Sequence, residues 1–567
     1  MPRPLSTCLL LVLTLLACRT TEKTRDQRTL PPLSPSDANT LVEGYLTDTL
    51  EEAPAYARSL GLHEYDGKVM PVGPAAVSAR VARAQAHLKR LTEVDWSTLP
   101  DPQRLDLELT QLHAQQTVFA LQDRLEHRRV LFYGDQFDVS SYLVRDYAPL
   151  QERVEALIRH LDAAVANTDA VLNSLDLVQA RSHLITAKII SEGTLEYLSG
   201  DVVELSGPAL QQDAGLKARF ERSHGAAIAQ VRRVMAWIEQ ALPKANEDFR
   251  LGETLLLRML QVNEGLKTDL TSLRRMAEED FTRNRAAFEE VARRIAPDKD
   301  VMSVVAMVAN ERVPQEQLLD VAQKQLDDLR AFIEENDVIT IPSADRATVA
   351  VTPPFMRYNS AFLDPAGPFE KAKTSYYYIT PPDPSWPPEK QLGYLPYYGD
   401  LLATSIHEVY PGHFVQALHL DRAPSRAQKV FGSYAFSEGW AHYTEQMMLD
   451  AGFGGGQDRL RLGQLSNALL RNCRFLATLG LHVDGLSVDQ AQRLFQEKCF
   501  VDEGNAQQQA NRGTYDPGYL SYTLGKLQIL GLREKFFAKR NTRSLREFHD
   551  WLLSFGGAPL ALIEKRL

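Results

Sequence analysis

Cysteine is scarce in this chain of 567 residues, which contains only four cysteines. Cys8 and Cys18 lie near the N-terminus, so only Cys473 and Cys499 remain for the rest of the chain. Two cysteines are too few for a disulfide framework. In an oxidising compartment they could form a single disulfide, and two buried thiols on neighbouring helices are the alternative.

An excess of basic residues is also absent. The chain has 63 lysines and arginines against 73 aspartates and glutamates, which gives a formal net charge of −10. No run of the sequence is rich in lysine or arginine. A nucleic-acid-binding protein would need a basic patch or stripe, so we expect no nucleic acid among the partners.

The apolar run at the N-terminus, residues 8–16, is too short to span a bilayer. It follows Arg3 and precedes Ala17 and Cys18, which predicts a signal peptide over residues 1–17. The sequence LLAC resembles a bacterial lipobox and implies lipidation of Cys18, with residues 18–34 as a tether. Ordinary secretion after cleavage near Ala17 is the alternative. In the first case the protein is exported and lipid-anchored to the cell envelope, facing the periplasm or the extracellular side.

Amphipathic helix patterns fill most of the remaining sequence. In one of them, Leu318, Leu319, Ala322, Leu326, Leu329 and Ile333 share a single helical face. No repeat of fixed period occurs, which disfavours a solenoid. We therefore predict a mainly α fold in which residues 35–567 form one large body, with an N-terminal helical lobe over 35–337 and a catalytic helical lobe over 390–567.

Strand-like sequences occur only in the proline-rich segment 338–389. Val338–Ile341, Thr348–Thr352 and Ser375–Thr380 are rich in β-branched or aromatic residues and predict a small sheet. Prolines beside a strand are typical of a sheet edge, and an edge near a catalytic site could pair with an extended peptide. A sheet that merely joins the two lobes is the alternative.

The residues that could carry chemistry are concentrated between positions 405 and 445. His407 and His413 flank Glu408, and a second helical run carries Glu438. Zinc hydrolases use imidazole and carboxylate ligands, leave one coordination position for water, and need a nearby carboxylate as a base. This set of two histidines and two glutamates therefore predicts a metallohydrolase with one Zn²⁺ per chain. Iron or manganese is not excluded, although two histidines and a carboxylate without a thiolate favour zinc.

The two histidines are six residues apart, which would turn them about 240° from each other on an unbroken helix. Pro411 cannot donate to the carbonyl of His407, and Gly412 tolerates backbone angles that other residues avoid. We therefore predict a bulge over residues 409–412 that returns His413 to the face of His407. A straight helix over this segment would contradict ligation by both histidines.

The third ligand is predicted on the run Tyr434–Asp450, which we expect to begin as a helix at Ser437. Glu438 lies on this run and is the preferred ligand. Glu445 is seven residues later, near the same face, where it could orient a ligating imidazole. His442 could serve as a ligand, a substrate contact or an orienting group, and it ranks second for the metal.

Three motifs in this order, HEVYPGHF, SEGWAHYTE and PGYLSYTLGKLQILGLREKF, resemble the large bacterial family labelled domain of unknown function 885. Members of that family are regarded as zinc metallopeptidases of the gluzincin type, with a helical architecture similar to that of oligopeptidases. The resemblance implies a large multi-helical, zincin-like metallopeptidase body with the small sheet near the active-site cleft.

Carried over by position, the resemblance implies His407, His413 and Glu438 as zinc ligands, Glu408 as the base and Tyr522 as a stabiliser of the tetrahedral intermediate. The sequence departs from the family pattern at Tyr519 and at His442, which bears on substrate preference more than on the reaction. Arg512 lies in the same C-terminal segment as Tyr519 and Tyr522. Because a guanidinium can hold a carboxylate with two parallel hydrogen bonds, Arg512 could bind a substrate carboxylate.

Three functions remain open on these grounds. Hydrolysis of short peptides in the cell envelope, with Glu408 as the general base, is the leading prediction. A zinc hydrolase of another amide or an ester is the second, because neither fold nor site fixes the bond that is cleaved. A non-catalytic binding lipoprotein is the third, and the complete set of ligands and base argues against it.

Overall fold

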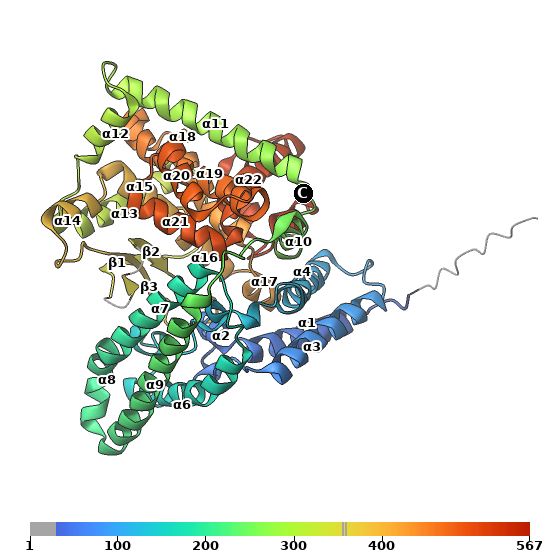
Figure 1. Ribbon diagram of the computed structural model, residues 1–567. Coiled ribbons are helices and arrows are strands. Elements are labelled where there is room, and N and C mark those ends of the chain that lie inside the picture. The colour runs from blue at the N-terminus through green and yellow to red at the C-terminus, as the bar shows by residue number, and fades with distance from the viewer. Residues whose placement is uncertain (1–29, 354–355, 358–359) are drawn as a thin grey trace, which may run out of the picture.

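The computed structural model describes residues 30–353, 356–357 and 360–567. Its described part is mainly α-helical and includes one small three-stranded sheet (Figure 1). The expected signal peptide, Cys18 and all but the end of the expected tether lie outside the described residues. Within the described part, no helix has both the length and the apolar character that a membrane crossing requires.

The first part of the chain forms the lower lobe in Figure 1, drawn in blue to green. Its helices are α1 (Pro35–Glu52), α2 (Pro54–Ser59), α3 (Pro74–Thr92), α4 (Asp101–Val118), α5 (Ser141–Val144), α6 (Leu150–Ser174), α7 (Arg181–Ser199), α8 (Asp201–Gln212) and α9 (Ala214–Ala241).

The rest of the chain forms the upper lobe, with the sheet on the side that faces the lower lobe (Figure 1). Its helices are α10 (Gly252–Glu264), α11 (Leu270–Ile295), α12 (Val301–Ala309), α13 (Leu318–Glu335), α14 (Pro388–Tyr394), α15 (Tyr398–Glu408), α16 (His413–Leu420), α17 (Arg426–Val430), α18 (Tyr434–Asp450), α19 (Asp458–Leu479), α20 (Val488–Cys499), α21 (Glu503–Tyr515), α22 (Ser521–Arg540), α23 (Leu545–Leu553) and α24 (Leu560–Glu564).

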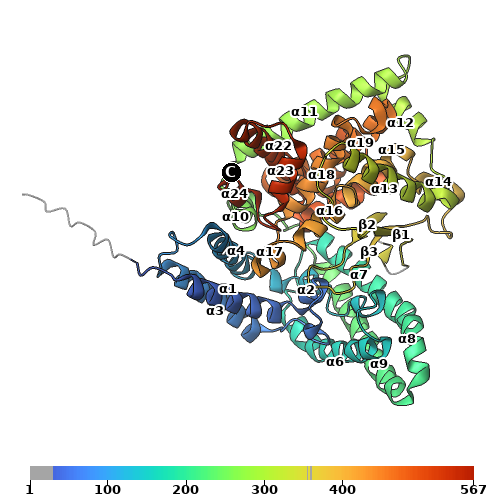
Figure 2. The same ribbon diagram turned by 180° about the vertical axis from the view of Figure 1, so that it is seen from behind.

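The division between the lobes does not coincide with residue 337, where the sequence suggests it. Helices α10 to α13 precede that residue, yet they pack with the C-terminal helices. Helix α11 lies along α19, where the side-chain amides of Asn284 and Asn472 are joined by a 2.8 Å hydrogen bond. Figures 1 and 2 both place α18 in the middle of this lobe with α11 on its outside.

Burial along the helices follows the apolar pattern of the sequence. In α13, Leu318, Ala322, Leu326, Leu329 and Ile333 are buried on one face, as predicted, whereas Leu319 is only partly buried. The same core includes residues of α1, α4, α15, α16, α18, α22 and α23. The helices that carry the candidate site are therefore held by one continuous apolar core.

The sheet contains β1 (Ala347–Val351), β2 (Ala361–Asp364) and β3 (Ser375–Ile379) in the order β1-β3-β2. Strand β3 is parallel to β1 and antiparallel to β2, so β1 and β2 are the edges.

The prediction was right for β1 and β3 but wrong for Val338–Ile341, which is not a strand. Val338 and Ile339 are buried in the core, so that apolar run serves packing rather than pairing. Strand β2 was not predicted, because Ala361–Asp364 is short and contains no β-branched residue.

Helices α18 and α22 pack closely at a pair of glycines. A Cβ on Gly525 would lie 1.8 Å from the carbonyl oxygen of Ala435, and a Cβ on Gly439 would lie 2.5 Å from the backbone of Gly525. Only glycine permits this approach. The close packing places Glu438 of α18 beside Tyr522 of α22, which is how the two motifs meet at one site.

A disulfide joins Cys473 of α19 to Cys499 of α20, with the Cα atoms 6.3 Å apart. Both residues are buried. Of the two alternatives that the sequence left open, the structure contains the bonded pair. The bond links α19, which lies against the candidate site, to the neighbouring helix.

Candidate metal centre

The segment between the two histidines is a break between helices. Helix α15 ends at Glu408, residues 409–412 leave the helical path, and α16 begins at His413. The peptide bond between Tyr410 and Pro411 is cis. The predicted bulge is therefore a full interruption, and it turns His413 back toward His407, whose ring centre lies 4.9 Å from that of His413.

Two contacts fix the shape of this break. A Cβ on Gly412 would lie 1.7 Å from the carbonyl oxygen of His407, so no other residue fits at this position. The indole Nε1–H of Trp440 donates to the carbonyl oxygen of Pro411 at 2.9 Å. Trp440 is fully buried on α18, and it therefore ties the break to the helix that carries Glu438.

Helix α18 begins at Tyr434, one turn earlier than the Ser437 start predicted from the sequence. Its N-cap is Ser433, whose hydroxyl accepts from the backbone N–H of Phe436 at 2.9 Å. The buried carboxyl group of Glu264, at the end of α10, contacts this hydroxyl and accepts from the N–H of Ala435 at 3.1 Å. Burial raises the pKa of Glu264 to about 7.

His407, His413 and Glu438 converge, and their ligand atoms all lie within 4.8 Å of one another. Glu438 Oε2 is 3.4 Å from Nε2 of His407 and 3.5 Å from Nε2 of His413. This oxygen is buried and has no hydrogen-bond partner among the described residues. The three side chains come from α15, α16 and α18, and they could hold one metal ion.

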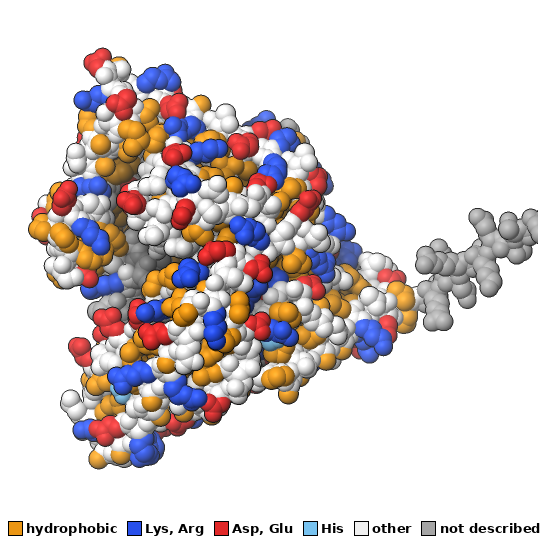
Figure 3. Space-filling view, viewed as in Figure 1, with side chains coloured by type: hydrophobic (Ala, Val, Ile, Leu, Met, Phe, Trp, Pro, Cys, Tyr) orange, Lys and Arg blue, Asp and Glu red, His pale blue; other side chains and the backbone are white. Residues whose placement is uncertain are grey.

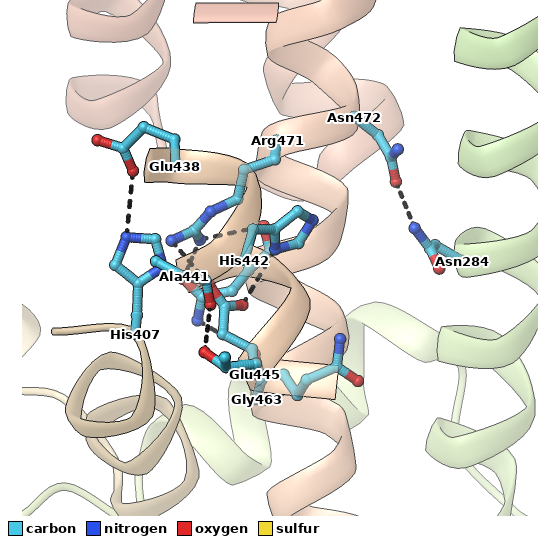
Figure 4. Close-up of polar contacts among 12 residues, drawn as sticks. Asn284, His407, Glu438, Ala441, His442, Glu445, Gly463, Arg471 and Asn472 are labelled. Carbon is cyan, nitrogen blue, oxygen red and sulfur yellow. Dashed lines mark hydrogen bonds and ion pairs between the residues drawn. The ribbon is translucent and has the colours of Figure 1, made fainter. Parts of the chain in front are cut away.

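Glu445 holds the other side of the His407 ring. Its Oε1 is 2.7 Å from Nδ1 of His407, and Arg471 of α19 lies 3.2 Å from the same oxygen (Figure 4). A proton on Nδ1 that is donated to Glu445 leaves the lone pair of Nε2 directed at the cluster. Glu445 therefore lies where the sequence predicts an orienting group.

The charges of this cluster shift its pKa values. Burial lowers the pKa of His407, but the neighbouring carboxylates of Glu438 and Glu445 outweigh it and raise the value to about 9. Burial raises the pKa of Glu438, yet the two histidines hold it well below its usual range. Burial likewise raises the pKa of Glu445, but the charge of Arg471 and the hydrogen bond with His407 hold it low.

His442 is not part of the three-residue cluster. It is fully buried behind it, with Nδ1 3.4 Å from Oε2 of Glu445 (Figure 4). Burial lowers its pKa to about 4, so its imidazole is neutral at pH 7. Of the roles open to His442, the structure disfavours ligand and substrate contact and places it against the orienting carboxylate.

Glu408 is directed toward the sheet rather than into the cluster of ligand atoms. Its Oε2 accepts a 2.9 Å hydrogen bond from the backbone N–H of Leu363 in β2. The edge strand that sequence analysis missed therefore positions the carboxylate that follows the first histidine. This contact places the small sheet next to the site, as predicted.

Tyr522 lies beside the histidines. Its ring is nearly parallel to that of His407, at an angle of 15°, with the ring centres 6.3 Å apart. Burial raises the pKa of Tyr522, so the phenol keeps its proton at neutral pH and can donate a hydrogen bond. Helix α22 thus brings the predicted tyrosine to the cluster.

Arg512 and Tyr519 occupy different environments. The Arg512 guanidinium lies 2.9 Å from Asp516 and donates to the hydroxyl of Tyr434 at 2.8 Å. Tyr519 is fully buried with its ring under the Arg512 guanidinium. The structure therefore disfavours Tyr519 as a substrate contact, while Arg512 is already paired with a carboxylate.

Sequence reasoning missed three contributors to this site: Trp440, Arg471 and the backbone N–H of Leu363. Trp440 lies inside the second motif, which could have indicated its role. Arg471 lies on α19, where nothing in the local sequence distinguishes it from a surface residue. A backbone group has no sequence signature at all.

On the face of the molecule shown in Figure 3, lysine, arginine, aspartate and glutamate side chains are interspersed.

Two solved structures have a fold similar to that of this chain. The first is described as "a putative lipoprotein of unknown function from Shewanella oneidensis"; it is 22% identical, has a TM-score of 0.77, and the match covers 93% of this chain and 99% of that chain. Another is described as "the putative lipoprotein from Colwellia psychrerythraea", with 20% identity, a TM-score of 0.74, and coverage of 93% and 98%. No curated protein matches the chain.

The family expected from the three motifs is found over nearly the whole chain. A family model described as "Bacterial protein of unknown function (DUF885)" matches residues 54–567, which include the break between the histidines, α18 and α22. The chain therefore belongs to the bacterial family of unknown function DUF885.

Proposed function

We propose that this protein is a zinc-dependent hydrolase that cleaves peptide bonds in short peptides, in a zincin-like helical body. The observation that carries the proposal is the convergence of His407, His413 and Glu438, with Glu408 next to the first ligand and outside the cluster. A metal site that only stabilises a fold closes its coordination with protein ligands. Three protein ligands and a nearby free carboxylate are the arrangement of a catalytic site.

The donor set fits zinc. Ligand atoms about 2.0–2.1 Å from a tetrahedral zinc ion lie about 3.4 Å from each other. Glu438 Oε2 is 3.4 and 3.5 Å from the two imidazole nitrogens, and it lacks any other partner among the described residues. Two imidazoles and one carboxylate without a thiolate are also the ligands most usual for zinc.

When bound, the metal would supply a Lewis acid that polarises the scissile carbonyl and favours ionisation of water. Glu408 would accept a proton from that water and later deliver it to the departing amine. The N–H of Leu363 holds the Glu408 carboxylate in place. The Tyr522 hydroxyl would donate to the oxygen on which negative charge develops.

The position of β2 supports an extended peptide as the substrate. Thr380 N–H donates to the carbonyl of Ser360, so the next residue, Ala361, directs its backbone groups away from β3. The edge of β2 that faces away from β3 therefore lies beside Glu408, which accepts from Leu363 on this edge, and a peptide backbone could align at Ala361 by strand addition. This favours a peptide over other amides and esters.

The cell envelope is the proposed location. The support is the resemblance of LLAC to a lipobox at Cys18, together with solved relatives that are described as lipoproteins. The lipid would be the protein's only attachment to the membrane.

The metal is tested on purified protein that lacks residues 1–18. We expect about one zinc per chain, lost in His413→Ala and in Glu438→Ala. His419→Ala is the matched control, because His419 lies on the same helix as His413 but outside the cluster. Wild-type protein that takes up no metal after loading with zinc would contradict the proposal.

Catalysis is tested by digesting a peptide mixture and identifying the products by mass spectrometry. We expect Glu408→Gln to retain zinc but to lose several orders of magnitude in turnover. The control is Glu278→Gln, an exposed carboxylate on α11. Near-native turnover by Glu408→Gln would exclude Glu408 as the base, and wild-type protein that binds zinc but cleaves no peptide would exclude the peptidase.

A further inference from the structure

Three arginines surround the Tyr522 ring. The guanidinium carbons of Arg471 and Arg474, on α19, lie 5.8 and 4.5 Å from the ring centre, and that of Arg512, on α21, lies 6.0 Å from it. The rings of Tyr434 and His407 also lie beside it, with their centres 5.9 and 6.3 Å from that of Tyr522. Tyr522 therefore contacts both the arginines and a candidate metal ligand.

Two of these arginines have a carboxylate partner. Arg471 lies 3.2 Å from Glu445, and Arg512 lies 2.9 Å from Asp516. Each of these cations is therefore neutralised within the protein, and neither has an evident need for a charge from outside.

Arg474 differs from its two neighbours. Only 7% of its surface is exposed, yet it forms no ion pair with any described residue. Its Nε–H donates to Oε1 of Gln509 at 2.9 Å, and its guanidinium lies over the Tyr522 ring. No described residue accepts a hydrogen bond from its two terminal amino groups. A guanidinium keeps its charge in proteins, and a buried charge is costly unless it is paired.

We propose that Arg474 binds the C-terminal carboxylate of the peptide substrate, an inference that rests on the proposed function. The planar guanidinium matches a carboxylate with two parallel N–H···O bonds. A short peptide carries a C-terminal carboxylate whatever its sequence. A fixed cation at this position could therefore bind peptides without requiring a particular side chain in the substrate.

The distance from the metal centre sets the length of the departing fragment. An extended peptide advances about 3.3–3.6 Å per residue. The Tyr522 ring centre lies 4.5 Å from the guanidinium carbon of Arg474 and 6.3 Å from the ring centre of His407, so these two groups are at most about 11 Å apart. About one to three residues therefore fit between the scissile carbonyl and the carboxylate. The enzyme would release short fragments from the C-terminus, because a peptide that extends beyond Arg474 does not place its terminal carboxylate beside the guanidinium.

The first test compares N-acetylated peptides of random sequence as free acids and as C-terminal amides. We expect the wild-type enzyme to cleave the acids at least about tenfold faster and to release one to three C-terminal residues. Arg474→Gln should reduce the rate on acids to the rate on amides, whereas Arg474→Lys should keep part of the preference. Arg459→Gln is the matched control, because Arg459 is exposed on the same helix and pairs with Glu311.

Equal rates of wild-type enzyme on acids and amides would overturn the proposal without any variant, so a poorly folded Arg474→Gln protein does not obscure the result. If C-terminal amides are cleaved only when their last residue is Asp or Glu, Arg474 binds a side-chain carboxylate rather than the C-terminal carboxylate.

A binding experiment separates this inference from the proposed function. The zinc-loaded Glu408→Gln protein is titrated calorimetrically with the tripeptide acetyl-Ala-Leu-Ala, as the acid and as the amide. We expect the acid to bind at least about tenfold more tightly and Arg474→Gln in the same background to remove the difference. Equal affinity for the acid and the amide, or no binding of either, would overturn the carboxylate subsite at Arg474. Tighter binding of the acid together with no peptide cleavage by the wild-type protein would overturn only the proposed hydrolase activity.

Discussion

The indole of Trp440 donates a 2.9 Å hydrogen bond to the carbonyl of Pro411. This bond joins the helix that carries one candidate ligand to the break that orients the other two. A break of four residues has few helical hydrogen bonds of its own, so a contact from a neighbouring helix is needed to hold its shape. The geometry of the three candidate ligands therefore depends on a residue outside their cluster.

Trp440→Phe should weaken metal binding while leaving all three ligands in place. The phenyl ring fills most of the buried volume, but the carbonyl of Pro411 loses its donor, which costs about 1–3 kcal/mol. We expect a lower zinc affinity in a competition titration with a chelator and a modest fall in melting temperature. Trp96→Phe is the control, because Trp96 lies in the first lobe, at the start of the turn before α4. An unchanged zinc affinity would show that the break holds its shape alone.

Gly412→Ala should disrupt the same break, because the added methyl group would overlap with the backbone of His407. The added methyl would lie 1.7 Å from the carbonyl oxygen of His407, so α15 and α16 would have to move apart. We expect a loss of about 1–3 kcal/mol or more in unfolding free energy and the loss of bound zinc. Gly432→Ala is the matched control, because its added methyl would meet nothing within 4 Å. A variant with normal stability and normal zinc content would contradict this account.

Glu445→Gln should reduce zinc affinity by about 10–100-fold, the usual effect of removing the partner of a ligating histidine. The amide still accepts from Nδ1 of His407, but the charge that favours this tautomer is lost and Arg471 is left without a carboxylate. The measurement is a zinc titration, with Asp450→Asn, at the exposed end of the same helix, as the control. An unchanged affinity would show that Glu445 does not orient His407.

Acid should destabilise the protein through His549. This imidazole is fully buried, and burial lowers its pKa to about 3. As the pH falls from 6.5 toward 3, the unfolded chain takes up a proton that the folded chain does not, so stability falls by up to about 1.4 kcal/mol per pH unit for this group. We expect His549→Gln to lose less stability than wild type between pH 6.5 and 4.5, in urea denaturation with a chelator present.

His63→Gln provides the opposite control for that experiment. Burial lowers the pKa of His63, but its contacts with Asp66 and Glu370 prevail and raise it above 6.5. Its contribution to stability is therefore present below pH 6.5 and is lost as the pH rises through the folded pKa. Removing it should therefore leave the slope between pH 6.5 and 4.5 nearly unchanged and should reduce the loss of stability as the pH rises above 6.5. A His63→Gln variant that flattens the acid slope as His549→Gln does would contradict the assignment.

The family, the helical class and the three ligand candidates could be predicted from the sequence because they depend on local information. The six-residue spacing with Pro411 and Gly412 excludes a straight helix, and the apolar periodicity of runs such as Leu318–Glu335 indicates which face is buried. The start of α18 was misplaced by three residues, because Ser437 and Ser433 are both suitable caps. Only contact with Glu264 distinguishes Ser433.

Other features depended on contacts between residues far apart in the chain. Strand β2 forms because β3 pairs with it, and Phe362 is the one residue in its short sequence that favours a strand. Arg471 and Arg474 lie one turn apart on α19 and look alike in the sequence, yet one meets Glu445 and the other meets no carboxylate among the described residues. Burial by neighbouring helices determines that difference.

The sequence by itself determined which groups can bind a metal and where a helix must break, because residue type and backbone freedom are local properties. The tertiary structure alone decided that Glu445 supports His407, that Leu363 holds Glu408, and that Arg474 lies over the Tyr522 ring without a carboxylate from the part of the chain that the structure describes. These relationships arise from the packing of α15, α18, α19 and α22 around one core, and no short stretch of sequence encodes the distance between two helices.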